Sequence, residues 1–306
     1  MTAIKITHKG EYQKMKLDFT DRKKLWLWLT MAFGYANPRM WELLEKYDSL
    51  ETFCDDLANK RCGFVNQAEA ERAAYSSFAQ ACAVADHCRR KNIHILTYDD
   101  DLYPERLRQI NCPPAVLFVI GDVTSLSADN TLSMIGTRTP SDYSSAIARE
   151  FSSYFTSEGF TIISGFAIGV DSISHHGALD AGGRTIAVLG SGIEYDYPRN
   201  TMDFKRQIAA NGAVVSEFFP QAKPLPENFK VRNRIVAALS KAVLVVEAGI
   251  KSGTLNTVNH ALEQGRDVFV IPPHDIFSDK YAGQCALLKD GAEAVYSPKD
   301  LLEMIK

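Results

Sequence analysis

The sequence predicts an α/β protein in which a doubly wound, mostly parallel β-sheet follows a small helical domain. From about residue 93 onward, short segments that are apolar on both faces recur at helix-length intervals, which is typical of a parallel sheet buried on both sides. Before that point, leucine and phenylalanine recur at helix-like spacing. We therefore expect a helical domain over residues 1–90 and a sheet domain over residues 91–306, with its core motifs in residues 131–296.

Short helices are expected in the first part of the chain. Gly34 and the Asn37-Pro38 pair interrupt the apolar pattern, so we predict a turn over residues 34–38, a helix from about 39 to 47, and further short helices after it. Small bundles of this kind bind partners or DNA backbones in some proteins and only pack in others. Both interpretations stay open for this part of the chain.

Eight segments in the second part are predicted strands. They are residues 92–98, 115–120, 131–135, 160–164, 185–189, 213–216, 242–246 and 267–271. Because ligands of a doubly wound sheet bind at the carboxyl ends of its strands, the residues that follow each segment are the candidates for a site.

The composition excludes several classes of protein. Hydrophobic residues make up 46% of the 306 residues, which is too many for a disordered chain. Lys and Arg number 34 against 37 Asp and Glu, which excludes a histone-like protein but not a local basic groove. The six cysteines form no CxxC pair, and the chain shows neither a signal-peptide pattern nor an apolar stretch of about 18 residues. We expect a soluble, cytoplasmic protein with free thiols and no membrane contact.

Four predicted strands are followed by glycines together with hydroxyl or cationic side chains. These residues are Gly136, Thr137 and Arg138; Ser164 and Gly165; Gly190, with Arg199 a few residues on; and Lys251, Ser252 and Gly253. Glycine lets the backbone approach a ligand closely, and the free N–H groups at a helix start favour an anion. One such sequence is usually only a tight turn, but four at one edge of a sheet predict a phosphate-rich ligand.

A cationic segment precedes an apolar helix further along the chain and contains Lys230, Arg232, Asn233 and Arg234. Cations at a helix N-terminus oppose the helix dipole, so an anionic partner explains them better than a solvated helix start does. A complete dinucleotide fingerprint, P-loop or serine-hydrolase elbow is absent from the sequence. A row of cations along the sheet edge fits the repeating charges of a nucleic-acid strand.

Ten ordered blocks of residues resemble the DprA/Smf family, the DNA-processing proteins of bacterial natural transformation. The blocks lie in residues 97–108, 113–122, 135–138, 164–175, 182–190, 197–198, 232–235, 247–248, 252–255 and 265–269. They include the Gly136-Thr137-Arg138 turn and the Arg232-Asn233-Arg234-Ile235 segment, and together they span about residues 93 to 296. The N-terminal helices are similar to the family's small helical domain, of the SAM or helix-hairpin-helix kind, but more loosely so.

The resemblance implies an extended Rossmann-like fold that binds and protects single-stranded DNA and loads the RecA recombinase onto it during DNA uptake. By that analogy Arg138, Arg199 and the Lys230/Arg232 segment would contact backbone phosphates. The family's self-association maps to about residues 284–295, with Leu287 and Leu288 as expected contacts of a homodimer. No cofactor is expected, and a metal is not expected either because nothing supplies a third ligand beside His175-His176 at metal-site spacing.

Three departures from the family pattern affect these expectations. Ile168 stands where a basic residue is common, which removes one expected phosphate contact. Pro273 stands in place of the usual glycine after Ile271-Pro272, so the loop that follows is expected to differ. The family's winged-helix tail is not expected in this chain, which ends at Lys306.

The alternative function is an enzyme. Glu247 at a strand end, with Ser252-Gly253-Thr254 nearby, is similar to the phosphate-binding turn of related folds that hydrolyse nucleotides. In such an enzyme Glu247 would act on an N-glycosidic bond as a general acid or base. No second acid or base is apparent at the matching strand ends, so we expect a binding protein rather than an enzyme.

Overall fold

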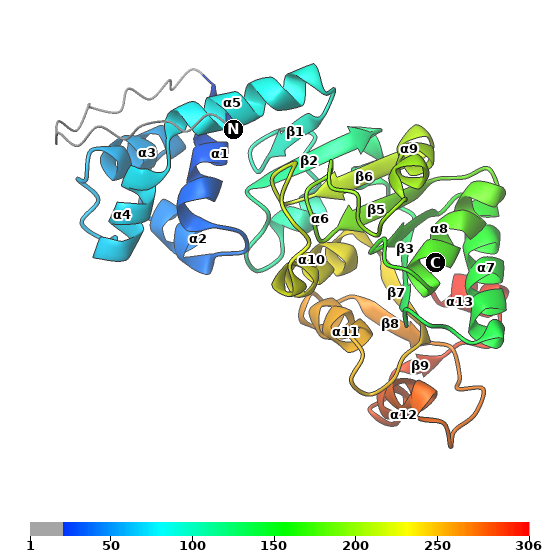
Figure 1. Cartoon of the computed structure of the whole chain (residues 1–306). Helices are drawn as coiled ribbons and strands as arrows, with labels where there is room; N and C mark the ends of the chain where they lie inside the picture. Colours follow the sequence, from blue (N-terminus) through cyan, green and yellow to red (C-terminus); the bar gives the residue numbers. More distant parts are fainter. Residues whose placement is uncertain (1–20, 306) are drawn as a thin grey trace. The chain divides into compact units, whose positions relative to one another are not determined.

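The computed structural model describes residues 21–305, and the chain divides into two compact units with the boundary between Val84 and Ala85 (Figure 1). Helix α5 (Phe78–Arg90) runs across this boundary. Among the described helices, none is both long and apolar enough to cross a membrane. The described residues also contain no cluster of His, Cys, Asp or Glu that could hold a metal ion.

The first unit consists of short helices whose starts are set by capping residues. Its helices are α1 (Arg22–Phe33), α2 (Pro38–Leu44), α3 (Leu50–Ala58), α4 (Gln67–Tyr75) and the beginning of α5. The Asn37 side chain accepts a hydrogen bond from the Arg39 N–H and is followed by a proline at the first helical position. Asn66 and Glu69 form a reciprocal capping box at the start of α4. The predicted turn at residues 34–38 is confirmed, and the helix after it ends at Leu44, three residues earlier than expected.

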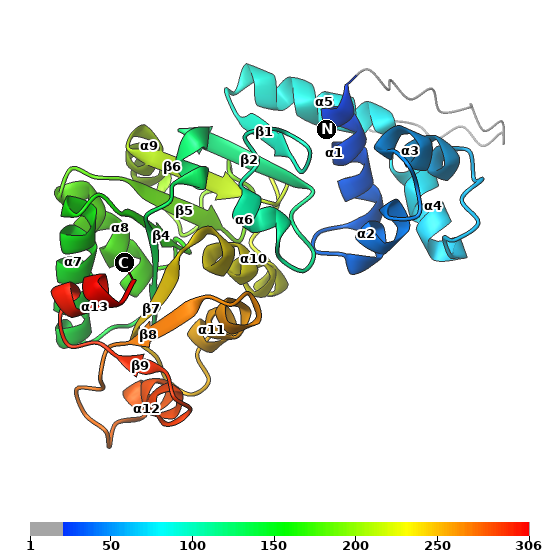
Figure 2. The same cartoon turned by 180° about the vertical axis from the view of Figure 1, so that it is seen from behind.

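The second unit is built on one nine-stranded sheet (Figure 2). In spatial order its strands are β1 (His94–Thr97), β2 (Val116–Gly121), β6 (Gly212–Ser216), β5 (Thr185–Leu189), β4 (Thr161–Ser164), β3 (Thr131–Gly136), β7 (Ala242–Glu247), β8 (Asp267–Val270) and β9 (Glu293–Ala294). The seven strands from β6 to β9 are parallel, whereas β1 and β2 pair antiparallel at one end. The predicted mostly parallel, Rossmann-like sheet is therefore confirmed.

Helices cover both faces of this sheet because successive strand residues point to opposite sides. The remaining elements are α6 (Glu105–Arg108), η1 (Val123–Ser127), α7 (Asp142–Ser157), α8 (Val170–Asp180), α9 (Met202–Ala210), α10 (Pro226–Leu239), α11 (Thr254–Glu263), η2 (Asp279–Tyr281), α12 (Ala282–Lys289) and α13 (Pro298–Ile305). Along β7, Val243 and Val245 pack with α10 and α11, while Leu244 and Val246 pack with α7, α8 and α13. Strands between two helical layers must be apolar on both faces, which explains their continuous apolar runs.

All eight predicted strands are present to within two residues at each end. Strand β9 was not predicted, because it has only two residues, Glu293 and Ala294, and carries no apolar run. Strands β3, β4, β5 and β7 are parallel neighbours, so their carboxyl ends lie at one edge of the sheet. That edge is where the sequence places its glycine and cation segments.

Candidate nucleic-acid interface

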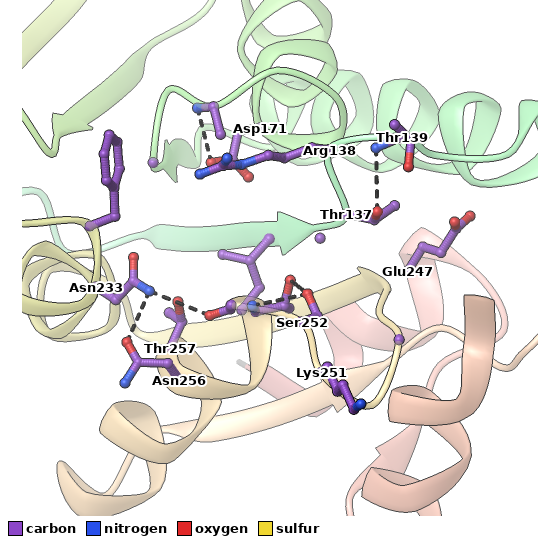
Figure 3. A pocket seen from close by; sticks show the side chains of 18 of the residues that line it. Thr137, Arg138, Thr139, Asp171, Asn233, Glu247, Lys251, Ser252, Asn256 and Thr257 are labelled. Carbon is purple, nitrogen blue, oxygen red and sulfur yellow. Dashed lines mark hydrogen bonds between the residues drawn. The ribbon is translucent and has the colours of Figure 1, made fainter. Parts of the chain in front are cut away.

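A pocket of about 1080 Å³ opens at the carboxyl ends of the strands. Its walls come from the turn after β3, the loop after β4, the start of α10, the segment between β7 and α11, and η2. Figure 3 shows Thr137, Arg138 and Asp171 on one side of the pocket and Asn233, Ser252 and Asn256 on the other. Segments far apart in the sequence thus meet at one opening, as the topology predicts.

Positive charge exceeds negative charge in the lining of this pocket. Arg138, Lys230, Arg232, Lys251 and Lys280 line it, together with the three carboxylates of Asp171, Glu247 and Asp279. Two of these carboxylates, Asp171 and Glu247, are buried. The side chains of Arg138, Lys230 and Lys251 are exposed, and none of them forms an ion pair with a carboxylate in residues 21–305. These three cations are therefore available to an anionic ligand.

The wall formed by α10 and α11 is held by side-chain hydrogen bonds. The amide nitrogen Nδ2 of Asn233 donates to Oδ1 of Asn256 at 3.0 Å. Oγ of Ser252 lies 2.8 Å from Oγ1 of Thr254 and accepts from the Thr254 N–H at 3.1 Å. Nothing lies within 4 Å of a Cβ added at Gly253, so this glycine leaves open space at the pocket rather than fitting against the protein. Asn233, Ser252 and Gly253 therefore lie together, as predicted.

Arg232 lines the pocket but is a buried, fully engaged cation. It is 4% exposed, and its guanidinium donates to the backbone carbonyls of Gly165 and Val188 at the ends of β4 and β5. Burial lowers the pKa of Arg232 to about 10, and the carboxylate of Asp171 acts in the opposite direction. Burial raises the pKa of Asp171, which Arg232 partly offsets. Arg232 is therefore engaged in holding the loop after β4, and its predicted contact with phosphates stays a prediction.

Arg232 and Asp171 also leave no room for a side chain at Gly165 in the loop after β4. A Cβ at Gly165 would lie 2.6 Å from a guanidinium nitrogen of Arg232 and 2.7 Å from Oδ2 of Asp171. The Asp171 Oδ2 atom in turn accepts from the Ala167 N–H at 3.2 Å. Gly165 also lines the pocket, so its predicted close approach to a ligand stays a prediction.

Three further predicted contacts do not reach the pocket. Arg234 is buried and pairs with Glu217 at 2.6 Å, because it points from α10 toward the sheet. Ser164 is fully buried, and its hydroxyl donates to the Met134 carbonyl. Gly190 is buried beneath the Phe229 ring, which would lie 2.6 Å from an added Cβ. These three residues are buried next to the site and do not line the pocket.

Arg199 lines a second pocket of about 360 Å³. This pocket shares Arg138, Ala167 and Phe229 with the first, so the two openings are neighbours. Its walls also include Tyr197, whose ring centroid lies 5.4 Å from that of Phe229, and Ile168, which is 53% exposed. Ile168 thus lies at the rim, where a basic residue would add charge.

Glu247 is 1% exposed and lies at the end of β7. Its Oε2 atom accepts hydrogen bonds from the N–H and hydroxyl of Ser141 at 3.0 and 2.7 Å. The Tyr281 hydroxyl lies 3.0 Å from the same Ser141 hydroxyl. Glu247 lines the pocket, and through Ser141 its carboxylate connects the start of α7 to η2.

The family model for DNA recombination-mediator protein A matches residues 94–306. The chain belongs to the DprA/Smf family. It is 37% identical over 215 residues to DNA processing protein DprA of Bacillus subtilis, covering 70% of this chain and 72% of that protein. It is 39% identical over 216 residues to protein Smf of Escherichia coli, covering 70% of this chain but 57% of that protein. The match therefore spans little more than half of the Escherichia coli relative.

Solved structures of DprA proteins share the fold. The Streptococcus pneumoniae DprA structure matches with a TM-score of 0.77 and 29% identity, covering 90% of this chain and 95% of that one. A Helicobacter pylori DprA structure, described for its unique single-stranded DNA binding mode, matches with a TM-score of 0.63 and 28% identity, covering 69% and 95%. The DprA/Smf resemblance inferred from the sequence is confirmed.

Some pocket residues of this DprA/Smf chain were missed by the sequence analysis. The aromatic rings of Phe229 and Tyr197 and the cation of Lys280 line the two pockets but were not predicted. Phe229 directly precedes the cationic segment, so an aromatic next to cations was the available signal. No sequence signal pointed to Lys280, because η2 comes to the pocket only through the packing of the loop after β8.

Leu287 and Leu288 of α12 are half-buried and pack partly against the protein's own core, and their role in a dimer stays a prediction.

Proposed function

We propose that this chain binds single-stranded DNA along the carboxyl edge of its sheet and delivers it to the RecA recombinase. One observation carries the proposal: three exposed cations, Arg138, Lys230 and Lys251, come from separate segments, surround one pocket, and lack carboxylate partners among the described residues. Family membership and the single-stranded DNA binding described for the Helicobacter pylori relative support it.

The geometry favours backbone recognition over base reading. The free charges are arginine and lysine at an open edge, which suits phosphates that recur along a strand. Phe229 and Tyr197 add ring faces between the two pockets, and every base can stack on such a face. Binding is therefore expected to tolerate any sequence and to weaken steeply with salt.

The test is fluorescence anisotropy of a labelled oligothymidine strand over a series of salt concentrations. Arg138→Ala and Lys251→Ala should each weaken binding and lower the slope of log K against log salt by about 0.7 per lost contact. Arg184→Ala is the matched control, because Arg184 is exposed but precedes β5 at the opposite edge of the sheet. Equal slopes for all three variants and the wild type would remove the pocket from the binding site.

The further steps proposed are a cytoplasmic homodimer and a handover of the strand to RecA during DNA uptake. Leu287→Glu should shift the sedimentation coefficient toward a monomer if α12 forms the dimer contact. For the handover, the chain should speed RecA-dependent ATP hydrolysis on a strand already covered by single-strand-binding protein, and Arg138→Ala should not. An unchanged rate with the wild-type chain would argue for DNA protection alone.

A nucleotide hydrolase remains the second candidate, because Glu247 lines the pocket beside Lys251 and Ser252. The distinguishing experiment is chromatographic detection of free base released from a nucleoside monophosphate. Release that Glu247→Gln abolishes would establish the enzyme, and absence of release under conditions where DNA binds would favour the binding protein.

A further inference from the structure

The segment between β8 and η2 presents two apolar side chains to solvent. Ile276 is 67% exposed and Phe277 is 91% exposed, the highest fraction among the described large hydrophobic side chains. Figure 1 shows this orange segment extending away from the sheet between β8 and α12. An aromatic ring left in water is informative when the backbone that carries it is well held, since a mobile tip would expose any residue.

This segment is anchored at several points. The Asp275 carboxylate accepts from the Phe277 N–H at 2.9 Å, and the Asp275 carbonyl accepts from the Ser278 N–H at 3.2 Å. On the preceding side, the His274 ring lies 4.8 Å from the ring of Tyr143. On the following side, Tyr281 is buried and its hydroxyl lies 3.0 Å from that of Ser141. A local turn around Asp275 therefore shapes the segment, and side-chain contacts at His274 and Tyr281 connect it to the rest of the unit.

The same segment forms part of the pocket rim. Asp279 and Lys280 line the pocket, and the Asp279 carbonyl would lie 3.3 Å from a Cβ added at Gly249, which also lines it. Phe277 is three residues from Lys280, so their Cα atoms are at most about 10 Å apart. Lys280 and Lys251 supply positive charge at this end of the pocket, and the Asp275 carboxylate is turned to its own backbone.

We propose that Phe277, flanked by Ile276, is a stacking platform for one base of the strand where it leaves the pocket past Lys280. The proposal rests on the proposed single-stranded DNA binding and names the side of the pocket from which the strand extends. Aromatic side chains that accompany a cationic groove hold single strands without sequence preference, and Phe277 precedes Lys280 of the pocket rim by three residues. A second copy of the chain is the alternative occupant, because α12 with the proposed dimer contacts Leu287 and Leu288 follows this segment, and the sedimentation measurement below distinguishes the two.

The first test compares oligothymidine affinities of the wild-type chain, Phe277→Ala and Leu262→Ala. Leu262 is the matched control, since it is 61% exposed but lies near the end of α11, at the opposite edge of the sheet. Loss of one stacked base should weaken binding of Phe277→Ala by about 5-fold or more. Its salt slope should stay unchanged because no cation is lost, and Leu262→Ala should bind like the wild type. A Phe277→Ala affinity within twofold of the wild type would overturn the platform.

The second test uses Phe277→Trp as a reporter. Oligothymidine should quench the fluorescence of this tryptophan beyond any change in the wild-type chain, whereas an abasic deoxyribose-phosphate strand of equal length should not. Equal quenching by both strands would overturn the stacking. A smaller sedimentation coefficient for Phe277→Ala would assign the surface to a second copy instead. Failure of the wild type to bind DNA would refute the proposed function itself, which a defect confined to Phe277→Ala would not.

Discussion

Replacement of Arg232 by methionine tests whether this residue holds the site or contacts its ligand. The side chain is 4% exposed, donates to two strand-end carbonyls and faces the buried carboxylate of Asp171. Arg232→Met leaves both carbonyls without this donor and Asp171 without its cation. Two buried carbonyls then lose a charged donor and a buried carboxylate loses a nearby cation, so we expect a loss of about 3–5 kcal/mol from the free energy of unfolding at pH 7.5.

The loss should depend on pH in a defined direction. Burial already raises the pKa of Asp171 in the folded protein, and without Arg232 it rises further. A carboxyl whose folded pKa is raised binds its proton more readily when folded, so its unfavourable contribution grows as pH increases through the folded pKa and is absent at lower pH. The difference between Arg232→Met and the wild type should therefore shrink on acidification.

The assay is urea unfolding followed by far-ultraviolet circular dichroism at pH 7.5 and pH 5. The double variant Arg232→Met/Asp171→Asn is the control, because it removes the unpaired charge and should recover part of the lost stability at pH 7.5. A loss below about 1 kcal/mol at pH 7.5 would refute the structural role assigned to the buried Arg232 charge, since surface charges contribute in that range. Near-native stability with abolished DNA binding would instead restore Arg232 as a phosphate contact.

Three further predictions concern buried groups of the second unit. Arg234→Met leaves the 3%-exposed Glu217 side chain without the guanidinium that pairs with it and should cost about 3–5 kcal/mol in urea unfolding; a cost below about 1 kcal/mol would contradict the pairing. Gly165→Ala should lower the melting temperature, because its Cβ would meet Arg232 and Asp171 at 2.6–2.7 Å. Gly253→Ala is the control and should not lower it, because open space surrounds Gly253. Equal melting temperatures of the two variants would count against the close packing at Gly165. Burial lowers the pKa of His175 to about 3, so its stabilising contribution is complete above its unfolded pKa of 6.5 and is lost as pH falls toward 3. The wild type should lose about 2 kcal/mol more between pH 6.5 and pH 5 than His175→Gln, and identical pH profiles would contradict this.

The fold was predictable because its signal is local. Strands between two helical layers must be apolar on both faces, and that requirement appears directly in runs such as Ala242–Glu247. The location of the site followed from the same topology, because parallel strands bring their carboxyl ends to one edge. Strand β9 escaped prediction, since it has two residues and pairs only by its backbone with β8.

The individual roles of the cations were not predictable in the same way. Lys230, Arg232 and Arg234 are close in sequence, and the sequence pattern treats them alike. On α10 they point in different directions: Lys230 is exposed at the pocket, Arg232 reaches the ends of β4 and β5, and Arg234 pairs with Glu217. Residues two apart on a helix lie on different faces, so burial rather than residue type decides which charge is free.

By itself, the sequence determined the family, the doubly wound sheet and the edge that carries the glycine and cation segments. The tertiary structure alone decided that Arg138, Lys230 and Lys251 are free while Arg232 and Arg234 are not, and it brought Lys280 to the same pocket. The physical reason is that strand and helix formation depend on local patterns of apolar residues. The availability of a charge depends on which carbonyls and carboxylates the folded chain places around it.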